Sequence, residues 1–166
     1  MTKENEITYC PSFIKYFEIT LNDIDDESAV SIGVISSPDK LNKKRMIGWD
    51  EGTIGLYSDG KIYNENGEGI EVTQPLKKND VIGCGYNLIT NEILFTVNGK
   101  LIEKKFNIFG EELCHTIGFK DYRDKTISIN FGDKEPFKYD IISYLKTYLK
   151  ERNEIKEKFK PSKDKW

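Results

Sequence analysis

Hydrophobic and polar residues alternate with a period of two from Phe13 to Phe131. In residues 16–21, YFEITL, the apolar residues at 17, 19 and 21 share one face of an extended chain, and residues 16, 18 and 20 share the other. Further strand-like segments follow along the chain: AVSIGVI (29–35), VIGCGYN (81–87), EILFTVN (92–98), LCHTIGF (113–119) and TISINF (126–131). This pattern predicts an all-β fold of two packed antiparallel sheets.

Dipeptides typical of tight turns separate several of these segments. Asp59-Gly60, Asn66-Gly67 and Asn98-Gly99 each place a glycine where a hairpin needs a positive φ. The segment EILFTVNGKLIEKKF, centred on Asn98-Gly99, is the strongest hairpin signal in the chain.

The periodicity becomes helical after Asp140, which is a suitable N-cap residue. We therefore predict a sandwich over residues 1–140, an amphipathic helix over residues 141–160 and a frayed tail over residues 161–166. The helix is expected either to pack back on the sandwich or to dock a partner. Its apolar positions have helical spacing: Ile142, Leu145, Leu149, Ile155 and Phe159.

Charge and hydropathy narrow the class of partner. The formal net charge is -3, yet residues 141–166 carry eight Lys or Arg against four Asp or Glu, so the sandwich itself is acidic. An acidic body is a poor electrostatic footprint for nucleic acid. The absence of an apolar run of about 18 residues argues against a membrane span, and the polar first ten residues argue against a signal peptide. We expect an intracellular protein, cytoplasmic or also nuclear.

Nucleophilic and metal chemistry is poorly supported. The chain has one histidine, His115, and three cysteines without a CxxC pair. His115 adjoins Cys114 in a predicted strand, so the two side chains point to opposite faces and cannot act as base and nucleophile. We interpret His115 as structural and Cys84 as a buried apolar thiol. No metal and no cofactor is expected.

Paired carboxylates would be the basis of a glycosidase. Glu18, Glu71 and Glu92 lie among the predicted strands, but solvent-facing alternation accounts for each of them. A glycosidase-like enzyme therefore remains an alternative, as does a carbohydrate-binding sandwich, which would need exposed coplanar aromatic side chains. Our main prediction is that the protein is not an enzyme.

The order of motifs along the chain resembles a SPRY domain, and more narrowly the Ran-binding protein M type of that family. The resemblance rests on YFEIT (16–20), SIGVIS (31–36), GWDEGTIGLYSDG (48–60), NDVIGCGYNLITNEILFTVNG (79–99), HTIGF (115–119) and INFGDKEPFKYDI (129–141). It implies a bent, jelly-roll-like β-sandwich that serves as a protein-binding adaptor. Relatives of this type are scaffold subunits of the CTLH (Gid-type) ubiquitin ligase, so the resemblance also implies a ligase-linked context.

This family has more strand-forming sequence before the segment equivalent to YFEIT than the dozen residues present here. We therefore expect residues 4–10 to pair as an edge strand.

The resemblance also implies a recognition edge made by two loops. One loop precedes Gly48-Trp49 and the other precedes the TISINF strand. An exposed Met and Tyr beside Arg would offer apolar area with a charged rim, which suits a protein or an acidic short peptide. Tyr122 is the best single anchor, whereas Trp49 is expected chiefly to pack. The predicted partner-binding residues are Lys43, Arg45, Met46, Asp121, Tyr122 and Arg123.

Overall fold

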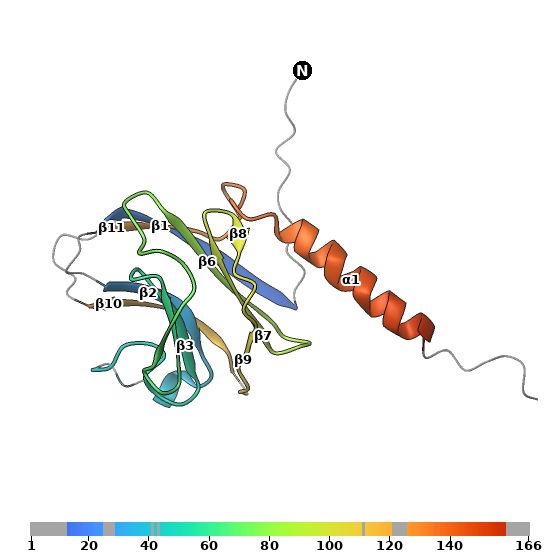
Figure 1. Ribbon diagram of the computed structural model, residues 1–166, viewed down its shortest axis with the longest axis horizontal. Helices are drawn as coiled ribbons and strands as arrows, with labels where there is room; N and C mark the ends of the chain where they lie inside the picture. Colours follow the sequence, from blue (N-terminus) through green and yellow to red (C-terminus); the bar gives the residue numbers. More distant parts are fainter. Residues whose placement is uncertain are drawn as a thin grey trace, which may run out of the picture.

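The computed structural model describes residues 13–24, 29–40, 42, 44–110, 112–120 and 126–158. Within these ranges the chain forms eleven strands, a short 3-10 helix and one α-helix (Figure 1). The elements are β1 (Ile14–Asp23), β2 (Ala29–Ile35), η1 (Pro38–Lys40), β3 (Thr53–Tyr57), β4 (Lys61–Asn64), β5 (Gly69–Glu71), β6 (Val81–Asn87), β7 (Glu92–Val97), β8 (Lys100–Leu101), β9 (Phe106–Asn107), β10 (Cys114–Lys120), β11 (Thr126–Asn130) and α1 (Ile141–Lys158).

The strands form two antiparallel sheets that face each other, so the predicted all-β sandwich is confirmed. Sheet A has the order β11-β1-β6-β7-β8, with β9 also paired to β7, and sheet B has the order β10-β2-β3-β4-β5. The predicted Asn98-Gly99 hairpin joins β7 to β8, and both turn residues have positive φ (51° and 79°). Two successive positive φ angles are the signature of a type I′ turn, whose twist matches that of the strands.

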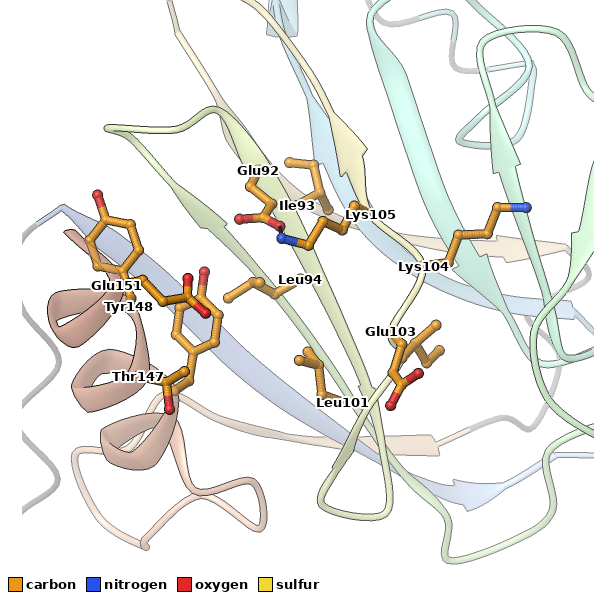
Figure 2. A pocket seen from close by; sticks show the side chains of 12 residues that line it. Glu92, Ile93, Leu94, Leu101, Glu103, Lys104, Lys105, Thr147, Tyr148 and Glu151 are labelled. Atoms are coloured by element: carbon orange, nitrogen blue, oxygen red, sulfur yellow. Dashed lines mark ion pairs between the residues drawn. The ribbon is translucent and has the colours of Figure 1, made fainter. Parts of the chain in front are cut away.

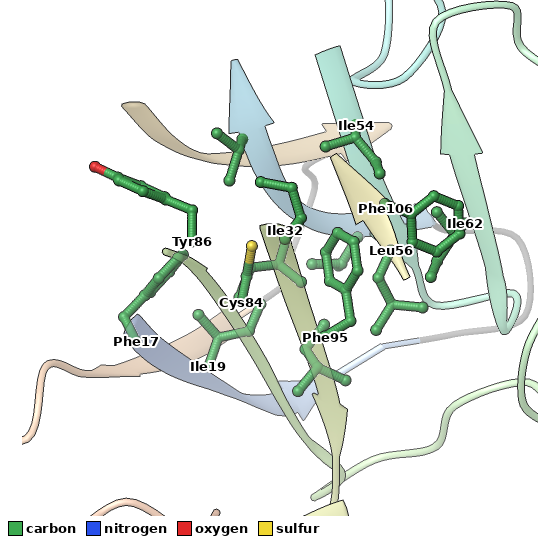
Figure 3. Close-up of a cluster of buried hydrophobic side chains, with 14 of the residues drawn as sticks. Phe17, Ile19, Ile32, Ile54, Leu56, Ile62, Cys84, Tyr86, Phe95 and Phe106 are labelled. Atoms are coloured by element: carbon green, nitrogen blue, oxygen red, sulfur yellow. The ribbon is translucent and has the colours of Figure 1, made fainter. Parts of the chain in front are cut away.

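The main core fills the space between the sheets (Figure 3). The inward-facing residues of β1 and β2, such as Phe17, Ile19 and Ile32, meet Cys84 of β6 and Phe95 of β7 there. Cys84 is fully buried, as predicted, and burial raises the pKa of its thiol. The thiol therefore stays protonated and acts as a small apolar group.

A second, smaller core covers the outer face of sheet A. Its buried members are Ile14, Tyr16, Leu94, Ile141 and Leu145, so the first turns of α1 pack on β1 and β7. The rest of the helix extends beyond the sheet (Figure 1), and Leu149 is half exposed.

This second core corrects the expectation for Glu18, which was predicted to face solvent. Glu18 does lie on the face opposite Phe17, but the chain before α1 covers that face, and Glu18 is only 3% exposed. Its carboxylate accepts hydrogen bonds from the Tyr16 hydroxyl (2.9 Å) and from the backbone N–H groups of Lys138 (2.8 Å) and Tyr139 (2.9 Å). These hydrogen bonds therefore hold the segment that leads into α1 against sheet A.

The predicted N-cap at Asp140 is confirmed. One carboxylate oxygen accepts the backbone N–H of Ser143 (2.9 Å) and the other accepts its hydroxyl (2.7 Å). These hydrogen bonds lower the pKa of Asp140. In the part of the chain that the structure describes, no helix combines the length and apolarity that a membrane span requires. The expected edge strand of residues 4–10 lies outside the described residues.

Candidate interaction surface

The loop that precedes β3 lies flat on the outer face of sheet B. Its residue Ile47 is buried over two glycines, Gly55 of β3 and Gly118 of β10. A methyl group added to Gly55 would lie 3.1 Å from Ile47 Cγ2, and one added to Gly118 would lie 3.2 Å from Ile47 Cδ1. Both contacts are tighter than ordinary van der Waals separation, so the absence of a side chain at these positions lets the loop approach the sheet.

Hydrogen bonds fix the same loop to its own sheet. The Tyr57 hydroxyl donates to the carbonyl of Ile47, and burial raises the pKa of Tyr57 so that this donor keeps its proton. The N–H of Gly48 donates to Thr53 Oγ1 (2.8 Å), which itself donates to the carbonyl of Asp50 (2.6 Å). The loop is therefore held at Ile47, Gly48 and Asp50.

This support presents one aromatic side chain, Trp49, to solvent. The indole is 48% exposed and stacks on Tyr63, with ring centroids 6.3 Å apart and planes 16° apart. Tyr63 in turn packs on Tyr57 (4.5 Å) and donates its hydroxyl to Asp59 (2.8 Å). Burial and then the bond to Asp59 raise the pKa of Tyr63 to about 12. Trp49 was expected chiefly to pack, but it is half exposed on a rigid aromatic base, a form typical of binding anchors.

The sequence around Trp49 contains a signal that favours exposure of its side chain. It lies between Gly48 and Asp50, two turn-forming residues, outside any alternating segment. An aromatic residue in such a loop has no strand face to pack against, which favours exposure.

Two of the predicted binding residues lie beside Trp49. Arg45 forms an exposed ion pair with Asp50 (2.8 Å between Nη1 and Oδ1), and Met46 is partly buried. The contact between Ile47 and Gly118 joins this loop to β10, which ends at Lys120 directly before the second predicted loop. The predicted residues Lys43, Asp121, Tyr122 and Arg123 lie outside the described residues. We use the name Trp49 face for the surface made by Arg45, Met46 and Trp49.

A second concave surface lies between α1 and the β7–β8 region (Figure 2). This groove has a volume of about 200 Å³, and its mixed walls include the apolar Leu94 and Tyr148. At its rim Lys105 pairs with Glu92 (3.2 Å between Nζ and Oε1). The lining residues are Glu92, Ile93, Leu94, Leu101, Ile102, Glu103, Lys104, Lys105, Tyr144, Thr147, Tyr148 and Glu151.

The carboxylates that a glycosidase would need have other surroundings. Glu18 is buried against backbone N–H groups, Glu92 is ion-paired, and Glu71 is exposed on β5 of the other sheet. Among the described residues no group of three or more His, Cys, Asp or Glu is placed to hold a metal ion.

His115 has the surroundings of a core residue. Its ring lies between those of Phe17 (4.5 Å) and Tyr86 (4.8 Å), and burial lowers its pKa to about 4. It is therefore neutral at physiological pH. The register with β2 places it on the inner face of β10, opposite to the face of Cys114, as the alternation predicted.

Comparisons with known proteins agree with the motif order. The SPRY domain profile matches residues 14–134. Ran-binding protein 10 of Danio rerio is 31% identical over 133 residues, which cover 80% of this chain and 21% of that protein. Ran-binding protein 9 of Homo sapiens is 30% identical over 136 residues (81% and 18%), and the Ran-binding protein M homolog of Arabidopsis thaliana is 29% identical over 130 residues (78% and 27%).

The fold comparison leads to the same architecture. A crystal structure of a human SPRY domain superposes with a TM-score of 0.60 at 21% identity, covering 70% of this chain and 76% of that one. The predicted resemblance is confirmed. The chain spans between 18% and 27% of the length of the three curated relatives named above.

Proposed function

Because the chain belongs to the SPRY domain family, we propose that it is a non-catalytic interaction module that binds a short peptide or a partner's surface through the Trp49 face. SPRY domains are typically interaction modules without catalytic activity, which supports the general assignment. The observation that carries the specific proposal is the half-exposed indole of Trp49, held on Tyr63 and Tyr57. A preordered aromatic side chain loses little conformational entropy when a partner packs on it.

The charges beside Trp49 define the ligand class. Arg45 is paired with Asp50 in solvent, where such a pair contributes little free energy and exchanges readily. A peptide carboxylate can take the place of Asp50 on the guanidinium while an apolar neighbour packs on Trp49. We therefore propose an acidic peptide with an adjacent apolar residue as the ligand, with Lys43, Met46 and the loop of Asp121, Tyr122 and Arg123 as further contacts.

The cellular context belongs to the same proposal. The relatives named above are Ran-binding proteins, and the resemblance to their type favours an intracellular adaptor linked to a ubiquitin-ligase scaffold. Co-purification of tagged chain with the subunits of such a ligase would test this context independently of the binding face.

The binding face is tested by selecting peptides from a random displayed library on the full chain and measuring Kd for the selected peptides. Trp49→Ala should weaken binding at least tenfold, and Arg45→Ala and Tyr122→Ala should weaken it less. Leu149→Ala, which removes a similarly exposed apolar side chain from the far part of α1, should leave Kd unchanged. Unchanged Kd in all three loop variants would refute the assignment of the face. A glycan array provides the remaining comparison, because glycan binding that depends on Trp49 would favour the carbohydrate-binding alternative.

A further inference from the structure

Two Asn-Gly pairs lie in loops of the sandwich. Asn66-Gly67 joins β4 to β5, and Asn98-Gly99 joins β7 to β8. An asparagine before glycine can lose its side-chain amide without an enzyme, because no side chain on the glycine hinders attack of its backbone nitrogen on the asparagine Cγ. Both asparagines are exposed to solvent. Sequence and exposure therefore do not distinguish the two pairs, whereas their hydrogen bonds do.

The side chain of Asn98 uses both of its polar atoms. Its Oδ1 accepts the N–H of Val81 (2.9 Å), and its Nδ2 donates to the carboxylate of Asp80 (2.9 Å). The backbone N–H of Asn98 also donates to the carbonyl of Val81 (2.7 Å). Attack by the nitrogen of Gly99 would require the amide to turn away from these partners before any reaction begins. The fold therefore protects Asn98.

The side chain of Asn66 is held only at its oxygen. Oδ1 accepts the N–H of Glu68 (3.0 Å), while Nδ2 makes no hydrogen bond to any described residue. A hydrogen bond to this oxygen stabilises the negative charge that develops there during attack on Cγ, and departure of Nδ2 breaks no hydrogen bond. The N–H of Gly67 donates to the carbonyl of Gly48, but at 3.2 Å this bond is at the long end of the usual range and gives limited protection.

We propose that Asn66 is a site of spontaneous deamidation that alters the support of Trp49. The nitrogen of Gly67 forms a bond to Asn66 Cγ while the bond from Cγ to Nδ2 breaks. Nδ2 leaves as ammonia with the proton of the Gly67 N–H, and a cyclic imide remains. One water molecule then opens the imide at either of its two carbonyls. One opening gives aspartate, and the other gives isoaspartate, in which the main chain runs through Cγ.

The altered peptide bond lies against Trp49. A methyl group added to Gly67 would lie 2.9 Å from the indole Cε3, and the N–H of Gly67 is bound to Gly48, the residue before Trp49. Isoaspartate lengthens the main chain by one carbon atom here and so moves Gly67 relative to the ring. Both products also add a negative charge beside the Trp49 face. Because that face is proposed to bind an acidic peptide, affinity should fall, and this consequence alone rests on the proposed function.

The two rates can be compared on the full-length chain. The chain is incubated at mildly alkaline pH, and peptides that contain residue 66 or residue 98 are followed by mass spectrometry, which detects replacement of the amide by a carboxyl group. We expect Asn66 to be converted at least fivefold faster than Asn98. In concentrated urea, where neither loop is held, the two rates should agree within about twofold. Equal rates in the folded protein, or an equally large difference in urea, would refute the proposal.

A matched variant tests why Asn98 is protected. Asp80→Ala removes the acceptor of Asn98 Nδ2 and should speed conversion of Asn98 at least threefold. Conversion of Asn66, which lies in the other sheet's loop and does not contact Asp80, should not change and serves as the internal control. An unchanged rate at Asn98 would overturn the structural reason given for the difference between the pairs.

The effect on the site is measured on aged chain after the forms are separated by ion exchange. Trp166→Phe provides the background, so that Trp49 is the only indole. The isoaspartate form should show shifted indole fluorescence, whereas Asn66→Asp, which keeps the main-chain length and an acceptor for the Glu68 N–H, should keep the spectrum. Both should raise Kd for a selected acidic peptide at least twofold.

The two readouts separate the modification from the proposed function. Unchanged fluorescence in the isoaspartate form would refute the effect on the support of Trp49. Shifted fluorescence with unchanged Kd would support the modification and count against the Trp49 face as the peptide site.

Discussion

Removal of the Glu18 carboxylate should loosen the attachment of α1 to the sandwich. The carboxylate accepts three hydrogen bonds, two of them from the backbone N–H groups of Lys138 and Tyr139. A hydrogen bond to a charged group contributes about 1.5 to 3 kcal/mol, but water can reach the partly buried N–H groups once the side chain is gone. We therefore expect Glu18→Ala to lower the free energy of unfolding by about 3 kcal/mol. Glu18→Gln should lower it by about 2 kcal/mol, because an amide keeps one acceptor oxygen and turns its NH₂ toward a donor.

The measurement is urea denaturation followed by circular dichroism, with Glu71→Ala as the control because Glu71 is an exposed carboxylate in a strand. The free energy of unfolding of the control should change by less than about 0.5 kcal/mol. Hydrogen exchange should show the loss first in the turns of α1 that carry Ile141 and Leu145. A decrease below 1 kcal/mol in Glu18→Ala, with unchanged exchange in those turns, would refute the anchoring role of the carboxylate.

The remaining predictions concern the buried histidine and the glycines under the Trp49 face. The pKa of His115 in the folded protein is about 4, below its usual 6.5, because the buried ring favours the neutral form. The free energy of unfolding should therefore be highest above pH 6.5, where His115 is neutral in both states. It should be lower by about 2 kcal/mol at pH 4.5, where the unfolded chain binds a proton that the folded protein does not. His115→Gln should remove that part of the pH dependence, and a difference between wild type and variant that does not change with pH would contradict the assignment. Gly118→Ala would place a methyl group 2.5 Å from Ser31 Oγ and 3.2 Å from Ile47 Cδ1, so both side chains must shift. It should lower the free energy of unfolding by about 1 to 2 kcal/mol and weaken peptide binding, which calorimetry would detect. Gly67→Ala places a methyl group 2.9 Å from the Trp49 ring at a φ of +70° and should shift the indole fluorescence; an unchanged spectrum would argue against the fixed stack.

The sequence alone predicted the elements whose residues carry their own local signal. Alternation in residues 16–21 predicted β1, the positive φ of Asn98 and Gly99 was predictable from their turn chemistry, and the cap at Asp140 followed from its place before a helical repeat. These signals arise from interactions within a few residues of one another, so a single chain segment contains them.

Burial that depends on distant segments was not predictable in this way. Alternation places Glu18 on the face opposite Phe17, but it does not show that residues 137–145 cover that face. The extent of the exposure of Trp49 was likewise not predictable from its local sequence, because it depends on Tyr63 and Gly67, which lie beneath the ring. For the candidate site, motif order predicted a loop in which Arg45 and Met46 lie close to Trp49, and their role in binding stays a prediction. The exposure of the indole itself was not predicted.

The buried thiol of Cys84 can be used to measure how often the two sheets separate. Water-soluble thiol reagents reach Cys84 only when the two sheets separate, since the side chain is fully buried and burial raises its pKa. Its labelling rate in the native state, divided by the rate in the denatured chain, measures the equilibrium of that separation without any denaturant. A ligand that binds the folded form would slow the labelling in step with its occupancy. One cysteine can thus serve as a binding assay for a partner of any chemistry.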